Sequence, residues 1–397
     1  DKTMRMTHFK NANVDVSQLA VGTWGLDSLR WNGAMSEEEA IAAIRAMIQG
    51  GVNLIDTAPN YGNHSSEQIV GKAIQGLNRS EIYISTKFGT HNDLFTGGVF
   101  RDARFGTVME EMASSLRNLQ TDYVDFYFLH WPDTHTPIAE TMCALNFLKQ
   151  QGKIRYIGLS NCDQTLLEEA MKYGQVDVIQ PPFSMIDQRS KALMQWCAEH
   201  GVDTMTYGSL SGGILTGRFR EVPDWPANDV RLSFYKGFRP EFFPRVMELM
   251  ATLDEIAQTH QVPVSQVAIN WSTQKDFVST ALVGVRSVRH VAENLNTFTW
   301  QLIPINNETC QKDEEMEQFI NHYRKETDKK YDRIVTRFTN CLTHPVRNQE
   351  TALGNLMADI LCDSLGIDLM LMGSGAIRSY ELGPVVHYQD LVECLPY

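Results

Sequence analysis

Eight short runs of β-branched and aliphatic residues recur between residues 19 and 298, and longer amphipathic stretches separate them. This alternation is typical of repeated strand–helix units that build a parallel sheet. Eight units in about 280 residues favour a closed (β/α)8 barrel of the TIM type, an α/β fold, over an open sheet. The predicted strands are Leu19–Thr23, Val52–Asp56, Ile82–Lys87, Val124–His130, Tyr156–Ser160, Val176–Gln180, Asp203–Tyr207 and Thr280–Val283.

The stretches between these runs have the period of amphipathic helices, as in Glu37–Ile48, Val108–Leu119 and Lys191–His200. Before the first strand, Arg5–Val16 alternates apolar and polar residues, so we expect an N-terminal β-hairpin across the floor of the barrel. Arg218–Pro240 contains three prolines and follows the seventh predicted strand. It is therefore predicted to be a long loop that contributes to substrate binding.

Composition excludes several classes of protein. Hydrophobic residues make up 43% of the 397 and charged residues 21%, as in a globular chain, and no apolar run approaches the roughly 20 residues of a membrane span. The formal net charge of −13 repels the phosphates of nucleic acids. The seven cysteines are scattered without a C-x-x-C pair, which favours reduced thiols over disulfides or a zinc site. We expect a cytoplasmic protein that binds neither membrane nor nucleic acid, and its oligomeric state is left open.

Four titratable side chains follow the predicted strands at the barrel end where reactive groups gather. Asp56, Lys87 and His130 end strands two, three and four, and Tyr61 lies in the loop after Asp56. Each alone also fits a structural role, such as a turn cap for Asp56 or a hydrogen-bonded core side chain for His130. Together they fit acid catalysis at a carbonyl group.

The chemistry depends on the proton of Tyr61. A phenol has a pKa near 10 and is a poor acid at neutral pH, but a nearby ammonium stabilises the phenolate and lowers that pKa. Lys87 would supply the ammonium, and Asp56 would supply the anion that a buried lysine needs. His130 would hydrogen-bond the substrate carbonyl oxygen, which Tyr61 would then protonate. A metal site formed by His130, Asp133 and His135 is not expected, because their spacing gives no reason for the three to converge.

The segments Asp-Thr-Ala-Pro-Asn-Tyr-Gly, Ser-Thr-Lys-Phe-Gly and Phe-Leu-His-Trp-Pro around these residues resemble the aldo-keto reductase superfamily over about residues 5–300. The resemblance implies NAD(P)H-dependent reduction of an aldehyde or ketone to an alcohol, with Tyr61 as the general acid of an Asp/Tyr/Lys/His tetrad. It also implies that Trp24 and Trp131 wall a pocket for a small carbonyl substrate. A cofactor-binding sensor or regulatory subunit with little turnover is the alternative, although a pure binding module has no need of a tuned tyrosine and lysine.

The sequence lacks both G-x-G-x-x-G and the P-loop, so the cofactor must be held by other means. The glycine-rich loop 207–213 can approach a pyrophosphate. The resemblance implies that Ser160 and Asn161 hold the nicotinamide carboxamide and that Tyr207 stacks on the nicotinamide ring. The resemblance assigns Arg286 to the 2′-phosphate of NADP, but His290 stands where many relatives carry Arg or Gln, so NAD stays possible. The implied cofactor-binding residues are Thr23, Trp24, Ser160, Asn161, Gln180, Tyr207, Ser209, Leu210, Gly284, Arg286, Glu293 and Asn294.

The pattern changes at 304–312, where we place a domain boundary. The predicted parts are a barrel over 1–304, a helical linker over 305–335 and a partial α/β domain over 336–397. Residues 319–397 resemble the carboxy-terminal nucleotide-binding domain of the 5′-nucleotidases, through Gly-Ser-Gly-Ala-Ile-Arg at 373–378 and Leu-Pro-Tyr at 395–397. That resemblance implies nucleotide contacts for Arg378 and Tyr397. The metal-binding domain of that family has no counterpart in these residues, so the segment is expected to be either cut from a longer chain or a fusion remnant, without hydrolytic activity.

Overall fold

The computed structural model describes residues 4–26, 31, 35–93, 96, 98–226 and 229–295, and further along the chain 334–337, 342–343, 381–382, 385–387 and 390. The chain divides into two compact units, Asp1–Thr299 and Trp300–Tyr397. In the second unit, β13 (Ile334–Arg337) pairs with β16 (Val385–His387), and β14 (Leu342–Thr343) pairs with β15 (Glu381–Leu382), both antiparallel. Arg378, Tyr397 and all but the last two residues of the predicted linker lie outside the described residues. The three domain limits stay predictions.

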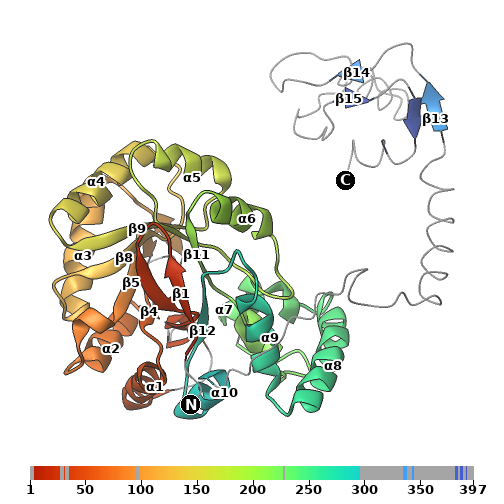
Figure 1. Ribbon diagram of the computed structural model, residues 1–397, viewed down its shortest axis with the longest axis horizontal. Coiled ribbons are helices and arrows are strands. Elements are labelled where there is room, and N and C mark those ends of the chain that lie inside the picture. The colour runs from red at the N-terminus through yellow and green to blue at the C-terminus, as the bar shows by residue number, and fades with distance from the viewer. Residues whose placement is uncertain are drawn as a thin grey trace. The chain divides into compact units, whose positions relative to one another are not determined.

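Eight parallel strands of the first unit close into a barrel, which confirms the predicted fold class (Figure 1). Every predicted strand matches an observed one, with ends that differ by one or two residues. The sequence identifies these strands because both faces are buried, so that apolar residues run almost continuously through each of them. In barrel order they are β3 (Leu19–Gly22), β4 (Leu54–Asp56), β5 (Tyr83–Phe88), β8 (Val124–Leu129), β9 (Ile154–Ser160), β10 (Val178–Gln180), β11 (Asp203–Thr206) and β12 (Thr280–Gly284).

The N-terminal hairpin closes the floor of the barrel, as predicted. Strands β1 (Met6–Phe9) and β2 (Val14–Ser17) pair antiparallel. Phe9 is fully buried and packs among inward-facing barrel residues, with its ring centroid 5.7 Å from that of Phe126. Because apolar side chains fill this end, the carboxyl ends of the strands form the mouth that is left for a ligand.

Helices surround the strands and cover their outer faces (Figure 1). The first, α1 (Glu37–Gln49), shows how the sequence specifies them: Ser36 and Glu39 form a capping box, and Ala40, Ala43, Ile44 and Met47 are buried at helical spacing. None of the helices in the described ranges is long and apolar enough to cross a membrane. The others around the barrel are α2 (Ser65–Ile74), α3 (Phe105–Leu119), α4 (Ile138–Gln150), α5 (Gln164–Met171), α6 (Lys191–Glu199), α8 (Phe243–His260), α9 (Val264–Thr273) and α10 (Val288–Leu295).

Two insertions shape the mouth of the barrel. Strands β6 (Thr90–Asn92) and β7 (Val99–Arg101) form a hairpin directly after β5, which the sequence analysis did not predict. Arg218–Pro240 was predicted to be a long loop, and the structure shows that helix α7 (Val230–Phe234) and a 3₁₀ turn lie within it. The 3₁₀ turn is held by Phe238, which is buried in the cluster that includes Met250.

Candidate active site

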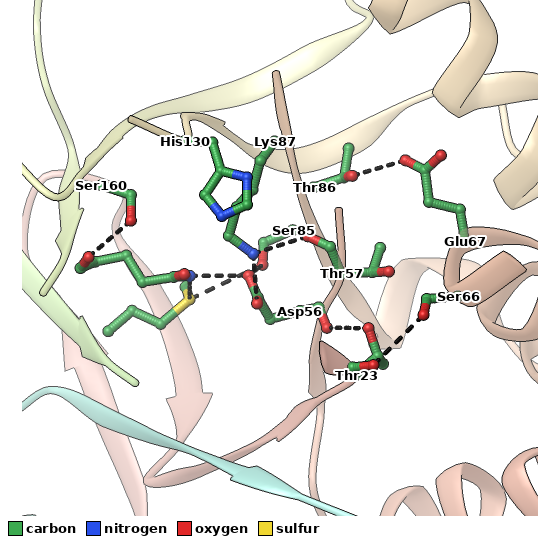
Figure 2. Close-up of polar contacts among 12 residues, drawn as sticks. Thr23, Asp56, Thr57, Ser66, Glu67, Ser85, Thr86, Lys87, His130 and Ser160 are labelled. Carbon is green, nitrogen blue, oxygen red and sulfur yellow. Dashed lines mark hydrogen bonds and ion pairs between the residues drawn. The ribbon is translucent and has the colours of Figure 1, made fainter. Parts of the chain in front are cut away.

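An ion pair between Lys87 and Asp56 lies at the carboxyl ends of β5 and β4 (Figure 2). Lys87 Nζ is 2.6 Å from Asp56 Oδ2 and donates a second hydrogen bond to the carbonyl oxygen of Thr57 at 2.8 Å. Lys87 is fully buried and Asp56 is 2% exposed. Burial lowers the pKa of Lys87, and the Asp56 carboxylate opposes that shift. The pair therefore lies where solvent is excluded, and the carboxylate favours the charged form of the amine.

The second oxygen of Asp56 is held as firmly as the first. Asp56 Oδ1 accepts hydrogen bonds from Ser85 Oγ at 2.5 Å and from Gln180 Nε2 at 2.8 Å. Gln180 belongs to β10, which is not a neighbour of β4 in the barrel. A carboxylate that is bonded from both sides of the barrel keeps its orientation, and so does the lysine it pairs with.

Tyr61 and His130 lie beside this pair. Lys87 Nζ is 5.0 Å from the centroid of the Tyr61 ring, and the Tyr61 and His130 ring centroids are 5.7 Å apart at an interplanar angle of 78°. Burial first, and then the positive charges of Lys87 and Arg101, hold the pKa of His130 well below its usual value. The imidazole is therefore neutral near pH 7 and can donate one ring hydrogen to a ligand. The structure thus brings all four predicted tetrad residues together.

The loop that carries Tyr61 is anchored on both sides. The amide of Tyr61 donates to the carbonyl oxygen of Ala58 at 3.2 Å, which closes a turn. His64 Nδ1 lies 2.9 Å from Glu67 Oε2, and Glu67 Oε1 accepts from the hydroxyl of Thr86 at 2.8 Å. Glu67 is buried, so these contacts tie the loop to β5, and they restrict the position of the phenol.

A cavity of about 790 Å³ opens at the mouth of the barrel, within the size range of cofactor and substrate sites. Thr23 is not part of its wall: this side chain is fully buried and its hydroxyl donates to the carbonyl oxygen of Asp56 at 2.9 Å. Lys87 also lies behind the wall and touches the Tyr61 ring instead. The other predicted residues that line the cavity are Trp24, Asp56, Tyr61, His130, Trp131, Ser160, Asn161, Gln180, Tyr207, Ser209, Leu210, Gly284, Arg286, Glu293 and Asn294.

The polar residues expected near a nicotinamide form one chain of hydrogen bonds. Asn161 Nδ2 donates to the carbonyl oxygen of His130 at 2.9 Å, and Asn161 Oδ1 accepts from the hydroxyl of Tyr207 at 2.7 Å. Ser160 Oγ donates to the carbonyl oxygen of Gln180 at 2.9 Å. Burial raises the pKa of the Tyr207 phenol, which therefore stays protonated as a donor. The carboxamide of a nicotinamide that binds here would form hydrogen bonds to these groups in place of some of the bonds they make to one another.

The glycine-rich loop after β11 has the backbone that its sequence suggests. Gly208, Gly212 and Gly213 have φ angles of +69°, +69° and +97°, in the left-handed region that glycine adopts without strain. A Cβ on Gly212 would lie 2.7 Å from a ring carbon of Tyr235, so only glycine fits there. Ser209 is buried, and its hydroxyl has no hydrogen-bond partner among the described residues. The loop offers a close backbone approach and an unused hydroxyl on the cavity wall.

Arg218, Arg286 and Arg289 line one end of the cavity and make it positively charged, with Glu293 3.0 Å from the Arg289 guanidinium as an acidic partner. His290 lines the same end, and burial lowers the pKa of its imidazole. Burial lowers the pKa of Arg286, and the charges of neighbouring arginines act in the same direction. Such a cluster attracts phosphate groups.

Several wall residues were missed by the sequence analysis. The Trp24 ring lies 4.9 Å from Phe234 and 5.4 Å from Trp31, centroid to centroid, so aromatic rings cover one side of the cavity. Thr90 and Arg101 of the β6–β7 hairpin line another side. The two short runs on either side of Gly97-Gly98 are the sequence signal for that hairpin.

Metal ligands are not grouped in the part of the chain that the structure describes: no three His, Cys, Asp or Glu side chains there lie close enough to hold an ion. Asp133 instead accepts hydrogen bonds from the amide of Ala103 at 2.9 Å and from the hydroxyl of Thr136 at 2.7 Å. This residue thus holds together two loops at the barrel mouth.

A family model described as the aldo/keto reductase family matches residues 18–313. The chain is 34% identical over 286 residues to the aldo-keto reductase YhdN of Bacillus subtilis (strain 168), which covers 71% of this chain and 85% of that protein. It is 30% identical over 305 residues to the NADH-specific methylglyoxal reductase of Escherichia coli (strain K12), at 74% and 93% coverage. Among solved structures, the glycerol dehydrogenase AKR11B4 from Gluconobacter oxydans matches with a TM-score of 0.66 and 29% identity, over 81% of this chain and 94% of that one. None of these matches supports the 5′-nucleotidase resemblance of residues 319–397.

Proposed function

Because this chain belongs to the aldo/keto reductase family, we propose that it reduces an aldehyde or ketone to an alcohol and that Tyr61 donates the proton. Its relatives support NAD(P)H-dependent carbonyl reduction in general, so the chain is an oxidoreductase. The finer assignment of Tyr61 rests on one observation: the buried ammonium of Lys87 lies 5.0 Å from the centroid of its ring.

The cavity fits a dinucleotide without a G-x-G-x-x-G motif. Gly212 leaves no room for a Cβ, the hydroxyl of Ser209 is unused, and Arg286 lines the positive end. We assign Ser209 and the glycine backbone to the pyrophosphate, Arg286 to the adenosine end, and Asn161 to the carboxamide. A bound nicotinamide cofactor supplies hydride to the carbonyl carbon.

The chain's own residues then act on the carbonyl oxygen. The neutral imidazole of His130 donates a hydrogen bond that orients the carbonyl group and shares the negative charge that grows on its oxygen. Tyr61 transfers its phenolic proton to that oxygen. The ammonium of Lys87 stabilises the phenolate left behind, and Asp56 fixes the ammonium, so proton transfer needs little rearrangement.

The positive end of the cavity favours NADPH over NADH. Arg218 and Arg286 line it, and each can pair with a 2′-phosphate, which only NADPH carries. The Escherichia coli relative is named as NADH-specific, so the family does not fix this preference. The ratio of kcat/KM values for the two cofactors tests it.

The decisive experiment compares wild type with Tyr61→Phe in NAD(P)H oxidation with a panel of aldehydes. We expect Tyr61→Phe to lower kcat by about 100-fold or more, since it removes the acid, while cofactor affinity, measured by fluorescence quenching, stays within about twofold. Tyr173→Phe is the matched control, because Tyr173 is an exposed tyrosine on the barrel surface. Tight cofactor binding by wild type without turnover of any aldehyde would contradict the proposal and favour a sensor.

A further inference from the structure

The β6–β7 hairpin places two polar side chains on the wall of the cavity that His130 also lines. Gly89, with a φ of +79°, turns the chain from β5 into the hairpin, and its amide donates to Glu111 Oε2 at 2.8 Å. Thr90 pairs with Arg101 across the hairpin, so their side chains leave the same face. Both residues line the cavity.

Both side chains carry buried donors without partners. Arg101 Nη1 and Thr90 Oγ1 are shielded from water and make no hydrogen bond to the described residues. Thr90 is 4% exposed. Native structures contain few such groups, and a donor left unsatisfied on a cavity wall indicates where a ligand would bind.

The charge of Arg101 is also uncompensated. Within the described ranges no carboxylate lies within ion-pair distance of its guanidinium, and the nearby acids are engaged elsewhere. Asp102 is paired with Arg104 at 2.5 Å, and Glu111 bonds the amide of Gly89. The guanidinium carbon of Arg101 lies 5.4 Å from the Trp131 ring centroid, a stacking that fixes its plane and leaves its edge available.

A guanidinium with a neighbouring hydroxyl recognises an oxoanion, because two or more donors converge on its oxygens. Trp131, on which Arg101 stacks, directly follows His130 in the chain. Arg101 and His130 line the same cavity, and the charge of Arg101 acts on the His130 ring, so an anion at Arg101 would lie near a carbonyl group at His130.

We propose that Arg101 and Thr90 form a subsite for a carboxylate or phosphate group of the substrate, so that the enzyme prefers short anionic aldehydes or ketones to neutral ones. The subsite rests on the proposed carbonyl reductase function and adds the substrate class to it. Asn60 also lines the cavity: its Oδ1 is buried, has no hydrogen-bond partner among the described residues, and can accept a hydrogen bond from a substrate hydroxyl.

The test compares matched substrates with the full chain. Succinic semialdehyde and its methyl ester differ in a carboxylate, and glyceraldehyde 3-phosphate and glyceraldehyde differ in a phosphate, so the two pairs identify the anion. We expect wild type to favour the anionic member of at least one pair by about 10-fold or more in kcat/KM, and Arg101→Met to remove most of that preference. Neutral aldehydes should change by less than about threefold, because Tyr61 is unchanged and burial, the largest cause, still lowers the pKa of His130 without Arg101.

Two variants and one direct measurement complete the design. Arg101→Lys should retain part of the preference because it keeps the charge but not the planar fork. Arg104→Met should retain all of it, because Arg104 is exposed and is paired with Asp102. Quenching of tryptophan fluorescence by succinate or inorganic phosphate, in cofactor-saturated protein, measures anion binding without turnover and should weaken in Arg101→Met.

The possible outcomes distinguish the proposed anion subsite from the proposed carbonyl reductase function. Equal loss for neutral and anionic aldehydes in Arg101→Met, or no preference in wild type, overturns the subsite and leaves Arg101 as a structural partner of Trp131. Failure of every aldehyde in wild type overturns the proposed function, and the quenching measurement then still decides whether Arg101 binds anions.

Discussion

Glu111 makes the stability of the barrel depend on pH. This glutamate of α3 has a side chain that is 12% exposed, and burial, with smaller contributions from Glu67 and Asp102, raises its pKa from 4.5 to about 8. The amide of Gly89, which donates to its carboxylate, opposes the shift. Glu111 therefore stays largely protonated in the folded protein at pH 7 but ionises in the unfolded chain.

The direction and size of the change in the free energy of unfolding follow from the difference in the pKa of Glu111 between the folded and unfolded states. As pH rises from 4.5, the unfolded state loses this proton first, so the folded state loses stability until the pH passes about 8. A pKa difference of about 3.5 units corresponds to an upper limit of about 5 kcal/mol. Rearrangement and water entry lower this figure, so we expect roughly 2–4 kcal/mol.

The perturbation is Glu111→Gln, which keeps an acceptor for Gly89 and removes the ionisation. Urea unfolding should give similar stabilities for variant and wild type near pH 5, and the variant should be more stable by roughly 2–4 kcal/mol at pH 8. Glu110→Gln is the control, because Glu110 is the exposed neighbour on the same helix. Parallel stability curves for Glu111→Gln and wild type from pH 5 to pH 8 would refute the reasoning.

Three further predictions concern the site. Lys87→Met should lower kcat by about 100-fold or more, with KM nearly unchanged, in steady-state kinetics, because the ammonium acts on the proton transfer. His130 has a pKa well below its usual value, so NMR should show a neutral ring between pH 6 and 8, and kcat should lack an acid limb near pH 6.5; an imidazolium signal in that range would contradict the burial argument. Arg286→Ala should raise the KM for NADPH by about 10-fold or more and leave that for NADH within about twofold. Equal effects on both cofactors would show that Arg286 does not contact the 2′-phosphate.

The barrel and three of the four tetrad residues could be predicted because their positions follow from strand order. A parallel strand such as β8 (Val124–Leu129) is buried at every position, so it reads as a continuous apolar run. In a barrel the carboxyl ends of the strands meet at one mouth, so Asp56, Lys87 and His130 had to converge there. Only the side-chain bonds, such as that from Gln180 to Asp56, required the structure.

The parts that escaped prediction depend on tertiary contacts. The β6–β7 hairpin has three residues in each strand, and its position is set by the left-handed turn at Gly89 and the bond to Glu111. Thr23 shows a different ambiguity: a hydroxyl at a strand end can face a ligand or link two strands, and here it bonds the backbone of Asp56. The sequence is the same whether the hydroxyl faces a ligand or links two strands, so only the structure distinguishes the two roles.

Mutations in the barrel strands should act differently from mutations in the inserted β6–β7 hairpin. Asp56 is held by Ser85 of β5 and Gln180 of β10, so the geometry of the proposed proton transfer depends on the closed barrel and should be the same for every substrate. Arg101 and Thr90 stand on a hairpin outside the closed barrel, so we expect their replacement to alter substrate affinity more than the geometry of the tetrad. Changes in the strands should therefore lower kcat for all aldehydes alike, whereas changes in the hairpin should alter the ratio between anionic and neutral ones.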